Sequence, residues 1–176
     1  MYDSDYWYVF FVKTNKEELA VKDINDAFSN DEIKAFVPYV ERFFKKEKEK
    51  QIMFQGYLFV ETTISSEEFR LRSWECIKKS KNIIKLLTYG DSEEAAIKSE
   101  ERKAIQKFWK NDNNGIDASK GIIEGDKVII TEGSLVGMEI IIKKIDRHKM
   151  KAYVEIEFLG KLHIVDIGLE IIKKVL

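Results

Sequence analysis

The sequence predicts an α+β fold, with an N-terminal ferredoxin-like, split βαβ domain and a small C-terminal SH3-like β-barrel. Through the first 110 residues, strand-like and helix-like segments alternate in the order β-α-β-β-α-β-α. A polar stretch follows, and beyond it short strand-like runs are separated by turn signals. We therefore expect an N-terminal domain over residues 1–110, a flexible linker over 111–120 and a barrel over 121–176.

The first domain opens on residues 6–13, an aromatic and β-branched run that predicts a strand. Residues 15–29 carry an apolar stripe with helical spacing, and Asn15 is a candidate cap for that helix. Strand-like character returns at residues 35–40. The single proline, Pro38, indicates that this strand lies at an edge or ends there.

The middle of the domain contains a charge-dense stretch at residues 42–51, which predicts a solvated hairpin tip between two strands. Ser65 and Glu68 have the spacing of a capping box, which marks the start of a helix. The remaining expected elements are a strand at 52–61, a helix at 65–79, a strand at 83–89 and a helix at 92–110.

The C-terminal part changes in character. Residues 111–120 contain one large apolar residue, which is typical of a linker. Five short strand-like runs with Gly-containing or charged turns between them then predict the barrel. These runs are 127–131, 138–146, 152–158, 162–165 and 171–175.

Composition excludes several classes of protein. The chain has 30 basic and 31 acidic residues, so a strongly basic nucleic-acid binder is excluded, and any nucleic-acid contact needs a local patch or a protein partner. The single cysteine, Cys76, rules out an intramolecular disulfide and reads as a small, partly buried apolar residue. No run approaches the roughly 20 apolar residues of a membrane span, so we expect a soluble, cytoplasmic protein without a membrane partner.

Catalytic motifs are absent from the sequence. His148 and His163 have no metal-ligand spacing with Cys76, and neither a glycine-rich phosphate loop nor a nucleophile motif occurs. Acidic pairs such as Glu17-Glu18 fall in first helical turns, where they complement the helix dipole. We therefore expect no catalytic residue, no metal site, no cofactor and no enzymatic activity.

Four segments, in this order along the chain, resemble the NusG family of transcription elongation factors, which join an NGN domain to a KOW barrel. They are Trp7–Val9, Phe36–Pro38, Phe54–Val60, and the series Glu124–Val128, Glu132–Leu135 and Ile142–Asp146. Two positions depart from the family pattern: Gln55 replaces the usual proline, and Ile140 replaces the usual KOW glycine. Because a β-branched residue does not readily adopt a positive φ, either the backbone at Ile140 is ordinary or the turn differs.

The resemblance implies that the N-terminal domain binds the clamp region of RNA polymerase through an apolar surface, at the positions of Trp7, Phe54 and Tyr57. Aromatic side chains suit this role because they bury a large area at a low entropic cost. The alternative is that these rings belong to the core. Strand alternation places Phe54 and Tyr57 on opposite faces unless the chain kinks near Gly56.

A local basic cluster surrounds the predicted turn between the second and third of these barrel runs. Its members are Lys143, Lys144, Arg147, His148, Lys149 and Lys151, and Lys161 with His163 extends it from a nearby turn. Several cations on one turn can hold phosphates, and a solvated loop is the alternative. The stretch 143–149 resembles LoaP, a specialised paralogue branch, which implies antitermination on selected long operons with RNA recognition by the barrel.

These inferences predict a monomer that binds RNA polymerase and a structured leader RNA and suppresses pausing and termination. Upstream or non-template DNA and the ribosome are further candidate partners, since in the family the hairpin corresponding to residues 42–50 lies near upstream DNA. Two alternatives stay open. One is a housekeeping factor whose barrel binds a ribosomal protein or a termination factor, and the other is a free-standing KOW protein that binds RNA or assists ribosome assembly.

Overall fold

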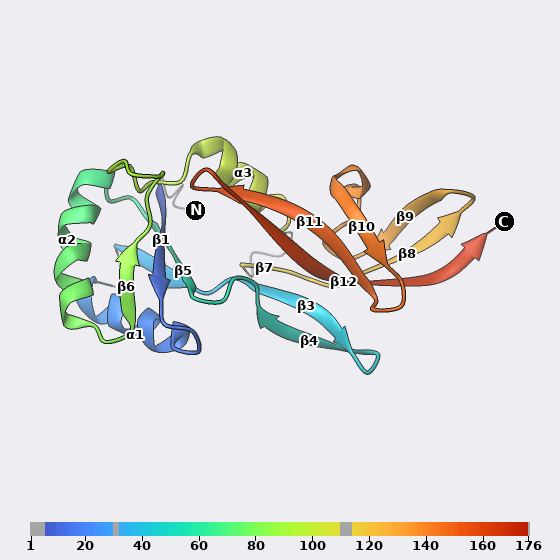
Figure 1. Cartoon of the computed structure of the whole chain (residues 1–176), viewed down its shortest axis with the longest axis horizontal. Coiled ribbons are helices and arrows are strands. Elements are labelled where there is room, and N and C mark those ends of the chain that lie inside the picture. Colours follow the sequence, from blue (N-terminus) through green and yellow to red (C-terminus); the bar gives the residue numbers. More distant parts are fainter. Residues whose placement is uncertain (1–5, 30–31, 110–113, 176) are drawn as a thin grey trace. The chain divides into compact units, whose positions relative to one another are not determined.

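The computed structural model describes residues 6–29, 32–109 and 114–175, and the chain divides into two compact units (Figure 1). Unit 1 comprises Met1–Pro38, Phe54–Arg102 and Phe158–Gly160. Unit 2 comprises Tyr39–Met53, Lys103–Glu157 and Lys161–Leu176. Each unit combines segments from both halves of the sequence.

Unit 1 is built on a four-stranded antiparallel sheet in the order β2-β5-β1-β6. The strands are β1 (Tyr6–Val12), β2 (Ile33–Phe36), β5 (Tyr57–Thr62) and β6 (Ile83–Leu86). One helix connects β1 to β2 and another connects β5 to β6. The predicted split βαβ fold is therefore confirmed, with the two most apolar strands in the centre.

The helices α1 (Glu17–Ala27) and α2 (Ser66–Lys79) pack on one face of this sheet and form the core with it. On that face Tyr8 stacks on Phe69 at 4.0 Å between ring centroids. The predicted capping of α1 is wrong, because the cap residue is Lys16 and Asn15 has a left-handed φ of 64°. Ser65 does precede α2, but its side chain makes no capping hydrogen bond.

The last helix of this region, α3 (Ser99–Gln106), is shorter than the helix expected over 92–110. Residues 92–98 are irregular because their backbone bonds elsewhere: the N–H of Ile97 donates to the carbonyl of Trp7, on β1, over 2.8 Å. Within the described residues, every helix is too short or too polar to span a bilayer.

Unit 2 contains a five-stranded sheet in the order β10-β11-β12-β8-β9, which confirms a β-rich C-terminal region. The strands are β8 (Ser119–Glu124), β9 (Lys127–Glu132), β10 (Ile142–Asp146), β11 (Lys151–Phe158) and β12 (Lys161–Val175). A 3₁₀ turn, η1 (Glu139–Ile141), precedes β10. Ile140 in this turn is absent from the residues with positive φ, so its backbone is ordinary, which was one of the two expectations for it.

Two strands expected at 162–165 and 171–175 are in fact one long strand, β12. Gly168 between them suggested a break, but it lies buried inside the strand. A Cβ atom built on Gly168 would lie 3.0 Å from the Glu41 carbonyl oxygen and 3.1 Å from the Phe43 ring. This glycine therefore allows a close approach of another strand and does not mark a turn.

The charge-dense stretch forms the predicted hairpin, with β3 (Tyr39–Phe44) paired to β4 (Glu47–Ile52). β3 also pairs in parallel with β7 (Gly115–Ile116). β7 and the start of β8 fall within the range expected to be a linker, and residues 111–113 of that range lie outside the described residues. The division into domains at 1–110, 111–120 and 121–176 stays a prediction.

Candidate functional site

The face of the unit 1 sheet that is turned away from α1 and α2 carries a cluster of aromatic rings. The Trp7 ring lies 5.9 Å from that of Phe36 and 6.3 Å from that of Phe59, edge-on to both. These rings come from three neighbouring strands, because β1 and β2 both pair with β5. Edge-to-face contacts at such distances are favourable beyond the area they bury.

A kink before β5 brings Phe54 onto the same face. Gly56 has a φ of +80°, and the N–H of Tyr57 donates to the carbonyl of Phe54 over 3.2 Å. The buried carboxylate of Glu17 accepts the N–H of Gly56 over 2.9 Å and so fixes this turn. As a result the Phe54 ring lies 6.1 Å from that of Phe59 and 6.3 Å from that of Tyr57. The structure therefore meets the condition under which Phe54 and Tyr57 can serve one surface.

Phe158, at the end of β11, covers this aromatic cluster within unit 1. Its ring centroid lies 5.2 Å from that of Phe54, 5.4 Å from that of Phe59 and 6.1 Å from that of Tyr57. Trp7 is 2% exposed and Phe54 7% exposed, whereas Tyr57 is half-buried. The three residues expected to bind polymerase are thus brought together, but two of them are buried.

The turn that carries Phe158 is held by Glu101. Its carboxylate accepts the backbone N–H groups of Leu159 and Gly160 over 3.0 and 3.3 Å, and the hydroxyl of Tyr89 over 2.5 Å. Sequence reasoning missed Phe158 and Glu101. One lay in an expected barrel strand and the other in an expected charged helix, and no local pattern links the two positions.

The basic turn joins β10 to β11 at residues 147–150. The carboxylate of Asp146 accepts the N–H of Lys149 over 2.9 Å, which shapes the turn. The pKa of Asp146 lies below its ordinary value, first because of this hydrogen bond and then because of the nearby cations, of which Lys149 has the largest effect. The acid in the middle of the basic cluster is therefore a structural part of the turn.

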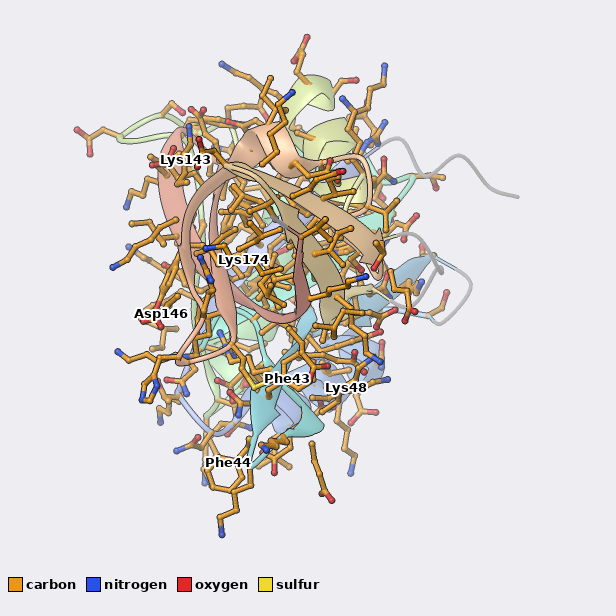
Figure 2. All side chains as sticks on the ribbon, turned by 90° about the vertical axis from the view of Figure 1, so that its right-hand side faces the viewer. Phe43, Phe44, Lys48, Lys143, Asp146 and Lys174 are labelled. Carbon is orange, nitrogen blue, oxygen red and sulfur yellow. The ribbon has the colours of Figure 1, made fainter. Side chains whose placement is uncertain are left out.

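The predicted basic residues lie on the turn after β10, on β10 itself, and at two separate positions described below. Arg147, His148 and Lys149 project from the turn and are exposed. On β10, Lys143 lies 3.8 Å from Glu155 in a largely exposed ion pair, and the Lys144 ammonium lies 5.7 Å from the ring centroid of Tyr153. These five residues belong to β10 and the turn that follows it, and Figure 2 labels Lys143 and Asp146 among the side chains of this part of unit 2.

Lys151 and Lys161 do not join that group. Lys151 forms an ion pair with Asp166, so its charge is already matched. Lys161 begins β12 at the opposite end of β11, an eight-residue strand that spans about 25 Å. His163 is half-buried, and burial followed by the charge of Lys161 lowers its pKa below the ordinary value.

Asp166 ties the β3–β4 hairpin to β12 within unit 2. Its carboxylate pairs with the guanidinium of Arg42 at 2.7 Å as well as with Lys151. Burial alone would raise the pKa of Asp166, but the hydrogen bonds from Arg42 and Lys151 outweigh it and hold the pKa below its usual value. Arg42 and Lys151 therefore have a structural role here.

The tip of that hairpin is solvated, as expected. Lys45 and Lys46 form the turn with φ values of 48° and 69°, and Phe44 beside them is 54% exposed. Phe44 and Lys48 lie on the end of unit 2 shown in Figure 2. Across residues 6–29, 32–109 and 114–175, no group of three or more His, Cys, Asp or Glu side chains is arranged to hold a metal ion.

Comparison with known proteins yields one family and a similar solved structure. The family model described as "Transcription termination factor nusG" matches residues 5–106. A solved structure of a NusG protein from Thermotoga maritima is similar at 18% identity and a TM-score of 0.49, over 93% of each chain. No curated protein matches the chain.

Proposed function

The chain belongs to the NusG family of transcription factors, and from that premise we propose that it binds RNA polymerase through unit 1 and suppresses pausing and termination. In this proposal the clamp region of the polymerase docks on the aromatic face of the sheet. Trp7, Phe54 and Tyr57 are the anchors. The barrel contacts RNA, and the factor acts on selected operons.

The observation that carries the proposal is the aromatic cluster on the face of the sheet turned away from α1 and α2. Rings from β1, β2 and the turn before β5 each lie within 6.3 Å of the Phe59 ring on β5. The opposite face of the sheet already forms a hydrophobic core with α1 and α2. The fold of unit 1 therefore does not require a second cluster of buried rings. A second concentration of rings beside half-buried Tyr57 has the composition of an interface centre.

Phe158 occupies part of this surface, so polymerase competes with it in our proposal. The contacts of Phe158 with Phe54, Phe59 and Tyr57 are edge-on ring contacts of the kind that polymerase side chains can replace. Departure of the turn at residues 158–160 also breaks the hydrogen bonds to Glu101. Binding therefore includes the cost of releasing that turn.

The RNA contact in the proposal rests on the turn after β10. Arg147, His148 and Lys149 are exposed on it, and Arg offers bidentate hydrogen bonds to phosphate. The resemblance of residues 143–149 to the LoaP branch supports action on particular operons. A structured leader RNA is the expected target, and upstream DNA near the β3–β4 hairpin is a further candidate.

The polymerase contact is tested by co-purification of the full chain with RNA polymerase core enzyme. Tyr57→Ala removes a half-buried ring from the aromatic face and is expected to reduce the retained polymerase at least tenfold. Trp74→Ala is the matched control, because it removes a ring that is 59% exposed on α2, the other side of the sheet. Equal retention by Tyr57→Ala and the unaltered chain would show that this face is not the docking surface.

A second candidate is a housekeeping factor whose barrel binds a ribosomal protein or termination factor. Exposed aliphatic side chains favour it, since Leu162 is 59% and Ile164 71% exposed on β12. A gel shift with structured leader RNA distinguishes the two, because phosphate contacts weaken steeply with salt. A free-standing KOW protein, by contrast, predicts no retention of polymerase by the unaltered chain.

A further inference from the structure

A hollow of about 330 Å³ lies between the basic turn and the C-terminal part of β12. Its lining residues are Arg147, Met150, Glu170, Ile171, Ile172, Lys173 and Lys174. The volume is at the lower end of the range for small-ligand sites. Lys173 and Lys174 come from the last strand of the chain, and the sequence pattern did not single them out.

A bulge interrupts β12 beside the hollow, just before the two lysines. Consecutive residues of a regular strand point to opposite faces. β12 pairs with β8 so that Ile171 lies opposite Gly121 and Lys173 opposite Ile122, which leaves Ile172 as an extra residue. Such a bulge twists the strand and re-aims its side chains. Lys173 and Lys174 follow this bulge, and both contribute to the lining of the hollow together with Arg147.

The hollow is formed in advance, because the backbone fixes the turn to β12. The N–H of Leu169 donates to the carbonyl of Met150 over 2.9 Å, and the N–H of Met150 donates to the carbonyl of Arg147 over 3.3 Å. Asp146 holds the other side of the turn through Lys149. A preformed site loses less entropy when a ligand binds.

The side chains that line the hollow suit one nucleotide of a nucleic-acid strand. Three cations, Arg147, Lys173 and Lys174, surround the hollow, against one carboxylate from Glu170. None of the three forms an ion pair with another described residue. Phosphate oxygens match these donors. Met150 and Ile172 provide an apolar wall for a ribose or an unstacked base.

We infer that this hollow binds one unpaired nucleotide of a single-stranded RNA segment, with its phosphate on Arg147, Lys173 and Lys174. The inference rests on the proposed RNA contact of the barrel and gives that contact a path. RNA runs from the turn after β10 onto the end of β12, and it does not pass Lys161 at the other end of the strand.

The test measures binding of the full chain to a fluorescein-labelled 12-nucleotide oligouridine by anisotropy, across a series of salt concentrations. The double variant K173Q/K174Q is expected to bind about tenfold more weakly at low salt. Its log-log salt slope should be smaller by about 0.7, the value for one lost phosphate contact on a single strand. K78Q/K79Q, which alters an adjacent lysine pair on α2, is the matched control and is expected to bind as the unaltered chain does.

Each outcome decides a separate point. Unchanged affinity and slope in K173Q/K174Q, with tight binding by the unaltered chain, overturns the hollow but leaves the RNA contact of the barrel in place. If the unaltered chain binds neither oligouridine nor a hairpin RNA with an unpaired loop, the RNA contact itself is overturned. Equal affinity for a 12-nucleotide oligothymidine overturns the assignment to RNA. Both lysines are exposed, so the double variant is expected to keep its thermal midpoint.

Discussion

The aromatic face of unit 1 and the basic turn of unit 2 are both candidate binding surfaces, yet they are presented in opposite ways. On the aromatic face Trp7 and Phe54 are almost fully buried. On the basic turn Arg147, His148 and Lys149 are exposed. A surface made of rings is thus hidden in the free protein, and a surface made of cations is open.

Solvation explains this difference. A contiguous apolar patch of several hundred Å² is costly in water and promotes aggregation, so a covering residue such as Phe158 stabilises the free protein. An unpaired cation, by contrast, loses hydration energy when it is buried and has to stay in contact with water. Substitutions on the aromatic face should therefore change stability first, whereas substitutions on the basic turn should change binding alone.

The largest expected effect is that of Trp7→Ala. Trp7 is 2% exposed and packs against Phe36 and Phe59, so its truncation should lower the free energy of unfolding by about 3–5 kcal/mol. Arg147→Gln, at an exposed position, should change it by less than about 0.5 kcal/mol. Urea denaturation followed by circular dichroism measures both. Similar losses in the two variants would remove the contrast between the surfaces.

Phe158→Ala sharpens the comparison, because it should affect stability and binding in opposite directions. Loss of the buried ring should cost about 3 kcal/mol of unfolding free energy. The same change uncovers Phe54 and Tyr57, so the folded variant should retain more polymerase than the unaltered chain. The measurement is co-purification at a temperature well below the melting midpoint of the variant. Reduced retention there would mean that Phe158 belongs to the docking surface itself.

The sequence was sufficient to predict the sheet of unit 1 and its two packed helices, because aromatic runs and strand alternation are local signals. It also singled out Trp7, Phe54 and Tyr57, whose role in binding stays a prediction. It also predicted the hairpin at residues 42–51. Local patterns did not reveal contacts between residues far apart in the chain. Phe158 lies about 100 positions from Phe54, and Asp166 is 124 positions from its partner Arg42.

Two errors had the same physical origin. Gly168 resembled a turn signal, but it permits the close approach of β3, and that strand lies far away in the sequence. Lys173 and Lys174 resembled an ordinary strand end, and only the folded structure shows that both line one hollow with Arg147. A residue type can be read from the sequence, but the neighbour that gives it a role depends on the tertiary fold.

Asp166→Asn tests whether a charged side chain in unit 2 stabilises the fold. The charged side chains of the basic turn are expected to contribute to binding and not to stability. Asp166→Asn should remove the ion pairs with Arg42 and Lys151 and cost about 1.5–3 kcal/mol at pH 7. The folded-state pKa of Asp166 is lowered by those two partners, so its stabilisation is full above the unfolded-state pKa of about 4. That stabilisation is lost as the pH falls through the folded-state value.

The stability difference between the unaltered chain and Asp166→Asn should therefore shrink on acidification. Urea denaturation at pH 7 and at pH 3 measures it, and the comparison of two chains cancels the titration of the other carboxylates. An equal difference at both pH values would mean that the charge on Asp166 makes no net contribution. Arg147→Gln, on the exposed turn, serves as the control and should show no such pH dependence, because Arg147 is not among the groups that lower the pKa of Asp146.

A smaller effect than those of Trp7→Ala and Phe158→Ala is expected for Gly56→Ala, which tests the kink that places Phe54 on the aromatic face. Gly56 has a φ of +80°, and an added Cβ would lie 3.2 Å from the Phe11 ring and 3.3 Å from the Val12 carbonyl oxygen. Gly90→Ala is the control, since Gly90 has a φ of +54° but nothing within 4 Å of the added atom. The left-handed backbone alone should cost each variant about 1 kcal/mol of unfolding free energy.

The crowding at Gly56 should add to that cost and disturb the hydrogen bond from its N–H to Glu17, so Gly56→Ala should lose about 2 kcal/mol. It should also retain less polymerase than Gly90→Ala, because a displaced turn moves Phe54 away from Phe59. Urea denaturation and co-purification of both variants measure the two effects. If the variants behave alike in both assays, the kink is merely tolerated, and polymerase binding does not depend on where it places the Phe54 ring.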